Sequence, residues 1–222
     1  MIVEKKNGSV SRENPVTDIR MFVTKKVKLL DKAGPWQTAM LAKLRRGIGK
    51  EPGELPELWE VTLDSLPGEL LSARGEASRG EWAVHTVLTL YALHRQGKNA
   101  SMNCKGVSLG KAMAQLRTAE NEESLKRRFD AVLTSKDFTE IARHARGVVQ
   151  LLKAADVRLD YPKLACDLYL FQSTNTHTKN KVRLRWGQDY YRLKRDDERH
   201  SEDVGETDTK VMKDQGKGKE NE

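Results

Sequence analysis

Apolar residues recur along this chain every three or four positions, which is the spacing of one buried helix face. The stretch 137–155 gives the clearest pattern, and its apolar face consists of Phe138, Ile141, Ala142, Ala145, Val148, Val149 and Leu152. Its other face carries Arg143, Arg146, Gln150 and Lys153. The pattern predicts an amphipathic helix with one face in a core and a basic face toward solvent.

The stretch 181–193 repeats this arrangement. On a helix, its large apolar residues fall within about 80° of one another, and they are Val182, Trp186, Tyr190 and Leu193. A second flank carries Lys181, Arg185, Gln188 and Arg192. A single charged helix face is usually only a solvated face. Because a basic face recurs on two helices, we infer that these faces have a function beyond contact with solvent.

Further helices follow from the same spacing and from capping residues. We predict helices that start near residues 18 and 76, and helices whose first turns are set by Pro35, Ser108, Asn121 and Asp160. Between residues 82 and 93 the chain is apolar on nearly all sides, which is typical of a helix at the centre of a bundle.

No stretch alternates between apolar and polar residues as a strand does, so the predicted fold class is all-α. We divide the chain into two helical bundles, at 18–119 and 120–195, with a flexible N-terminal arm at 1–17. The last segment, 196–222, is polar and almost free of large apolar residues. We predict that it is a disordered charged tail, because it cannot bury enough apolar surface to fold.

The charge distribution along the chain indicates what kind of partner this protein binds. The chain has a formal net charge of +8, but the stretch 194–222 holds seven Lys/Arg and ten Asp/Glu, so residues 1–193 carry +11. A body this basic predicts a polyanionic partner, with nucleic acid before an acidic membrane surface. We read Cys104 and Cys166 as reduced thiols, and no apolar run approaches a membrane span. We therefore expect a cytoplasmic protein.

The sequence contains no motif that is typical of a catalytic or metal site. The five histidines are scattered, and we interpret His85 and His94 as structural. Lys50 follows a Gly-Ile-Gly sequence, but Glu51 stands where a phosphate-binding loop needs Ser or Thr. All four tryptophans are assigned to core faces, including Trp59 on a short helix. We expect no enzyme, no metal and no cofactor.

Seven segments together resemble the CasB family, the small subunit of the type I-E CRISPR-associated Cascade complex. Each segment alone is only core packing with basic residues, and the ordered set carries the resemblance. The segments are LRRGIGKEPGELPELW (44–59), WAVHTVLTLYALHRQGKN (82–99), GVSLGKAM (106–113), LKRRFDAVLTS (125–135), ARHARGVVQLLK (142–153), LDYPKLACDLY (159–169) and RLRWGQDYYR (183–192).

The resemblance implies a non-catalytic subunit of two helical bundles that pairs head to tail with a second copy in a complex built on crRNA. Its partners would be the backbone and large subunits of Cascade, and target and non-target DNA. Its basic surface would support the R-loop, while sequence is read by base pairing. The positions that match the family's basic residues are Arg45, Arg46, Lys98, Lys111, Arg127, Arg128, Arg143, Arg146, Lys179, Lys181, Arg183 and Arg185.

Three other functions are weighed against this one. A stand-alone DNA-binding regulator would need a recognition helix after a short turn, and no such pair of short helices is evident. A purely architectural protein would use its basic faces to meet acidic protein surfaces. An enzyme ranks last, because inward-facing acids and paired catalytic groups are missing from the pattern.

Overall fold

The computed structural model describes residues 14–192, and they form helices and contain no β-strand. The predicted all-α fold class is thereby confirmed. The described residues divide into two compact units, and each unit is made of two separate segments of the chain. The first unit holds residues 14–103 and 161–173, and the second holds residues 104–160 and 174–192.

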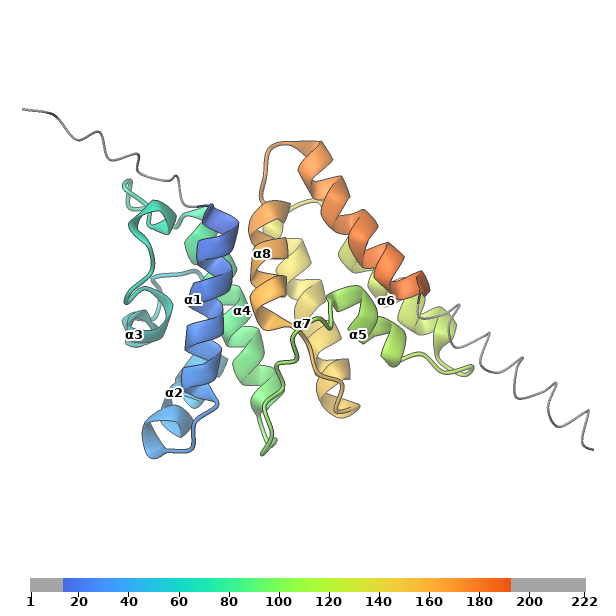
Figure 1. The fold of residues 1–222 in the computed structure, drawn as a ribbon, viewed down its shortest axis with the longest axis horizontal. Coiled ribbons are helices and arrows are strands. Elements are labelled where there is room, and N and C mark those ends of the chain that lie inside the picture. Colours follow the sequence, from blue (N-terminus) through green and yellow to red (C-terminus); the bar gives the residue numbers. More distant parts are fainter. Residues whose placement is uncertain (1–13, 193–222) are drawn as a thin grey trace, which may run out of the picture. The chain divides into compact units, whose positions relative to one another are not determined.

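The first unit is built around α4 (Arg79–Arg95), which packs against α1 (Pro15–Leu30), α2 (Pro35–Arg46) and α8 (Tyr161–Phe171). Figure 1 shows α1, α4 and α8 side by side. Helix α4 is buried on nearly all sides, as its sequence predicted. It begins with a capping box, in which Ser78 Oγ accepts from Glu81 N and Glu81 Oε2 accepts from Ser78 N.

Short elements complete the first unit. They are the 3₁₀ turns η1 (Pro56–Leu58) and η2 (Gly68–Leu70), and α3 (Trp59–Thr62) between them. The prediction that Trp59 lies in the core is wrong, because its side chain is 44% exposed. Leu58 and Val61 are buried instead. These two residues are three positions apart and share one side of the turn, whereas Trp59 lies about 100° away from Leu58.

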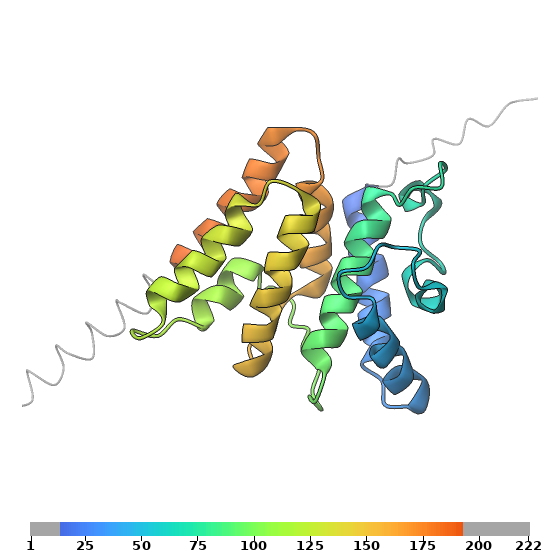
Figure 2. The same ribbon diagram turned by 180° about the vertical axis from the view of Figure 1, so that it is seen from behind.

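The second unit contains α5 (Leu109–Gln115), α6 (Glu122–Thr134), α7 (Phe138–Ala154) and a last helix at residues 176–192. Helices α6 and α7 pack against each other, and Figure 2 shows the short turn at residues 135–137 that joins them. Val182, Trp186 and Tyr190 are buried, as predicted. The Phe129 and Tyr190 rings stack at 4.7 Å.

The division into units differs from the predicted boundary at residues 119 and 120. Helix α8 belongs to the first unit because it packs on α1 and α4. Helix α5 belongs to the second unit and packs on α7. Each unit is therefore made of two separate segments of the chain. A single boundary in the sequence cannot describe such a division.

The structure corrects several of the predicted helix starts. Helix α4 begins at Arg79 rather than near residue 76. The last helix begins at residue 176 rather than 181, where Asn175 Oδ1 accepts from His177 N at 2.9 Å. Asn14 Oδ1 accepts from Val16 N at 3.0 Å and caps α1, so α1 begins at Pro15, inside the predicted arm at 1–17. Asn121 precedes α6, but its side chain makes no cap. Its Oδ1 accepts from Thr118 N instead, at 2.9 Å, and this bond shapes the preceding loop. The rest of the arm, Leu193 and the predicted tail at 196–222 lie outside the described residues.

Both histidines of α4 are structural, as predicted. His94 Nδ1 lies 2.8 Å from the Tyr161 hydroxyl, and His85 Nε2 lies 3.1 Å from the Gly47 carbonyl oxygen. Burial lowers the pKa of His85 below its ordinary value of 6.5, although the contact with Gly47 opposes the shift. The neutral ring is therefore the form that the fold holds.

The His85 pKa predicts a pH dependence of stability. Between the lowered folded pKa and 6.5 the unfolded chain binds more protons than the folded chain, so stability falls as pH is lowered through this window. A His85→Gln variant keeps a hydrogen-bond donor for Gly47 and does not titrate. Thermal unfolding between pH 7.5 and pH 5 should show a smaller loss of stability for the variant. Parallel curves for the two proteins would contradict the assignment.

Candidate nucleic-acid interface

The twelve basic residues expected to bind nucleic acid are divided unevenly between the units. The first unit holds Arg45, Arg46 and Lys98, and the second unit holds the other nine. Six of the twelve side chains are exposed, namely Arg46, Arg127, Arg128, Arg143, Arg146 and Lys181. The other six are partly buried. The second unit is therefore the stronger candidate for a binding surface.

Helices α6 and α7 bring three of these residues together. A groove of about 420 Å³ lies between the two helices, and we call it the α6–α7 groove. Its lining consists of Ser124, Arg127, Arg128 and Ala131 from α6, and Arg143, His144, Gly147 and Val148 from α7. Arg146 is exposed on α7 but does not line the groove.

The spacing of these residues explains why they face one another. The lining positions on α6 include pairs three, four and seven residues apart, and those on α7 include pairs three and four residues apart. Side chains with such separations lie on one side of a helix. The turn at 135–137 fixes how the two sides meet, and Asp137 Oδ1 caps α7 by accepting from Glu140 N at 2.8 Å. The sequence contained both rows of residues, but the turn brings them together.

The groove is rich in positive charge. Arg127 Nη1 lies 3.6 Å from Glu123 Oε1, but these side chains are 73% and 87% exposed, so the pair is weak. The Arg128 side chain has no acidic partner among residues 14–192. Exposed guanidinium groups that converge from two helices suit a phosphate, which accepts paired N–H donors.

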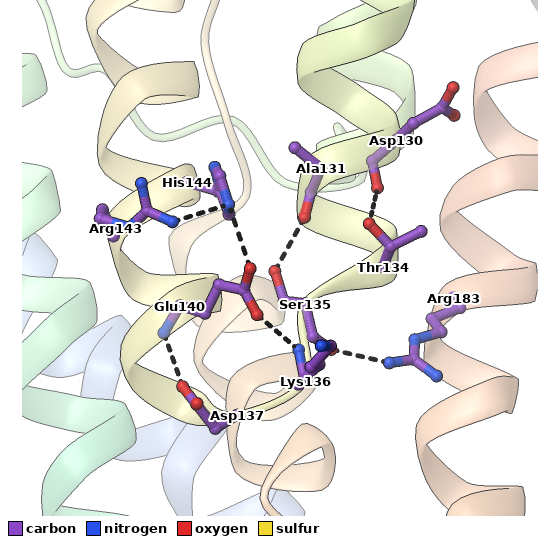
Figure 3. A network of polar contacts seen from close by, with 10 residues as sticks. All are labelled: Asp130, Ala131, Thr134, Ser135, Lys136, Asp137, Glu140, Arg143, His144 and Arg183. Carbon is purple, nitrogen blue, oxygen red and sulfur yellow. Dashed lines mark hydrogen bonds and ion pairs between the residues drawn. The ribbon is translucent and has the colours of Figure 1, made fainter.

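His144 is a lining residue that sequence reasoning missed as a candidate. Its Nε2 lies 3.2 Å from Arg143 Nη2 and 3.7 Å from Glu140 Oε1 (Figure 3). The neutral ring can accept from Arg143, whereas the protonated ring can pair with Glu140. Glu140 Oε2 also accepts from Lys136 N at 2.8 Å, so this carboxylate ties the start of α7. The one signal for His144 in the sequence is its position four residues after Glu140.

The Arg183 side chain makes its hydrogen bonds within the protein. Its Nη2 donates to the Ser135 carbonyl oxygen at 2.8 Å and its Nη1 to Asn180 Oδ1 at 3.2 Å. Figure 3 shows Arg183 reaching from the last helix to the turn between α6 and α7. Ser135 is fully buried, so the bond is sheltered. Arg183 therefore holds the last helix against the turn.

The remaining basic residues of the second unit lie on other elements. Lys179, Lys181 and Arg185 belong to the last helix, and Lys111 lies in the first turn of α5. Lys111 N donates to Ser108 Oγ at 3.3 Å, which confirms Ser108 as the helix cap. None of these four residues lines the α6–α7 groove.

The three candidate residues of the first unit lie at the C-terminal ends of α2 and α4. Arg46 Nη2 lies 2.6 Å from Glu57 Oε1, so its charge is partly met within the unit. Arg45 has no ion-pair partner among the described residues and lies in the last turn of α2. Lys98 follows α4 in a loop. None of these three residues lines the α6–α7 groove.

The described part of the chain offers neither a metal site nor a membrane span. Across residues 14–192, no group of three or more His, Cys, Asp or Glu side chains could hold a metal ion. No helix of that same part is long and apolar enough to cross a membrane.

Comparison with known proteins places this fold in a family. The family model for CRISPR-associated protein Cse2 matches residues 40–191. The crystal structure of CasB from Thermobifida fusca is 30% identical, with a TM-score of 0.65, and the match covers 79% of this chain and 97% of that one. A search of curated proteins finds no match.

Two further solved structures share the fold. A chain of a CRISPR RNA-guided surveillance complex is 22% identical, with a TM-score of 0.64 and coverage of 85% of this chain and 99% of that one. The crystal structure of M. ruber CasB is 22% identical, with a TM-score of 0.58 and coverage of 85% and 98%. The match to the Cse2 model spans more than half of the sequence. The chain therefore belongs to the CasB (Cse2) family of the type I-E CRISPR Cascade.

Proposed function

We propose that this protein is a non-catalytic small subunit of a type I-E Cascade that binds the nucleic-acid backbone through the basic surface of its second unit. The observation that carries the proposal is the convergence of Arg127, Arg128 and Arg143 on one open groove. Three guanidinium groups at one place can neutralise phosphates and release counterions, which gives affinity without reading sequence.

The proposed ligand is the R-loop, formed by the crRNA–target heteroduplex and the displaced non-target DNA strand. Base pairing reads the sequence in such a complex, so the protein needs only to hold backbones. The second unit suits this task, because it offers arginines on exposed helix faces. A head-to-tail pair of copies would repeat the groove along the nucleic acid. The complex would act in the cytoplasm, with the backbone and large subunits as partners.

Co-purification tests the proposal most directly. A tagged full-length chain, drawn from cells that express their CRISPR locus, should carry short RNAs of uniform length with one repeat-derived handle. The particle should have many times the mass of the chain. Cells in which the locus is silent provide the control. A lone protein without RNA, drawn from expressing cells, would contradict the proposal and favour a stand-alone regulator.

A further inference from the structure

Gly147 occupies a place where glycine is unfavourable and packing does not require it. It lies within α7, where glycine is a poorer helix former than alanine. An added Cβ at Gly147 would meet no atom within 4 Å. At Gly110 and Gly80, by contrast, a Cβ would come within 2.0 Å and 3.0 Å of a backbone oxygen. Close packing explains those two glycines and does not explain Gly147.

The open space at Gly147 belongs to the α6–α7 groove. Gly147 lines the groove together with the small residues Ser124 and Ala131. The basic side chains of the same lining are Arg127, Arg128 and Arg143. The volume of about 420 Å³ lies near the lower end of sites that hold a small ligand. A site with long cationic side chains and small neighbours suits a compact anion that enters between the arginines.

We propose that Gly147 keeps the α6–α7 groove open so that a phosphodiester of a nucleic-acid strand enters it, close to α7, and is held by Arg127, Arg128 and Arg143. This inference rests on the proposed function and adds where a phosphate is seated and which residue makes room for it. A side chain at position 147 would fill the space without removing any charge. Loss of binding would then come from shape alone.

The test compares Gly147 with a second helical glycine that lies outside the groove. Gly187, in the last helix, also has open space where a Cβ would lie, but it does not line the groove. We would replace each glycine by alanine and by leucine in the full-length chain. All four variants should melt about 2–4 °C higher than the natural chain, because both residues favour helix more than glycine does. A higher melting temperature also shows that each variant folds.

Binding should separate the two positions. The probe is a fluorescein-labelled 30-nucleotide single-stranded DNA, titrated at several salt concentrations. Gly147→Leu should weaken binding about tenfold and reduce the slope of log affinity against log salt by about 0.7, as expected for one phosphate contact on a single strand. Gly187→Leu should change neither quantity. Unchanged affinity and slope for Gly147→Leu would overturn the inference.

A third variant separates this inference from the proposed function. Arg128→Gln removes one charge of the groove and should weaken binding whether or not Gly147 makes room for a phosphate. If Arg128→Gln weakens binding and Gly147→Leu does not, only the inference about Gly147 fails. If neither variant changes binding, both the nucleic-acid function of the groove and the inference fail.

Discussion

Replacing Gly110 with alanine should destabilise the second unit by about 3 kcal/mol, at the upper end of the usual cost of overpacking. A Cβ on this residue of α5 would lie 2.0 Å from the Trp186 carbonyl oxygen and 3.1 Å from Asp189 Cβ. The nearest atom belongs to the backbone of the last helix and cannot rotate away. The two helices would have to separate, although alanine is the better helix former.

Separation would also break contacts around the point of close approach. Ser108 Oγ donates to Asp189 Oδ2 at 2.5 Å in a buried bond, and the Trp186 side chain of the last helix is fully buried. Burying these groups without their partners is unfavourable. The melting temperature, followed by tryptophan fluorescence, should fall by about 6–12 °C. Gly187→Ala is the matched control and should melt slightly higher than the natural chain. A change below about 2 °C in Gly110→Ala would contradict this packing.

Reversing the three arginines of the α6–α7 groove should weaken nucleic-acid binding about 100-fold at low salt, because phosphate contacts dominate affinity. The variant is Arg127→Glu with Arg128→Glu and Arg143→Glu. All three side chains are exposed, so the fold should persist. The slope of log affinity against log salt should fall by about 2, as expected for three contacts on a single strand.

A matched control separates a specific site from net charge. Lys32→Glu, Arg74→Glu and Arg158→Glu together change the charge by the same amount at exposed positions that do not line the groove. This control should bind nearly as well as the natural chain. Equal losses in both triple variants would mean that affinity follows net charge alone. If the groove variant fails to assemble with its partner subunits while retaining DNA affinity, the architectural function is the correct one.

Local signals were enough to place most of the helices. Capping and periodicity act within about one turn, so Ser108 before α5, Asp137 before α7 and the apolar face of the last helix could be recognised from the sequence. The prediction for Trp59 failed because periodicity needs several turns of helix to show which side is buried. Its four-residue helix is too short for periodicity to decide which side faces the core.

The candidate site was only half visible in the sequence. The basic faces of α6 and α7 could be recognised separately, and Arg127, Arg128 and Arg143 were predicted as binding residues. Their meeting at one groove, with His144 beside them, depends on the turn between the helices. Arg183 was also predicted as a binding residue, but its side chain donates to the Ser135 carbonyl oxygen within the fold. A side-chain contact across 48 residues leaves no local signal.

The sequence by itself determined the all-α class, most helix starts, the buried faces and the excess of positive charge, because each depends on residue type and on spacing within a few turns. The tertiary structure alone decided that α8 joins the first unit and α5 the second. It also decided which basic residues share a groove and that the groove is open at Gly147. These features depend on how helices far apart in the chain pack, and therefore on the shapes of surfaces that no single stretch encodes.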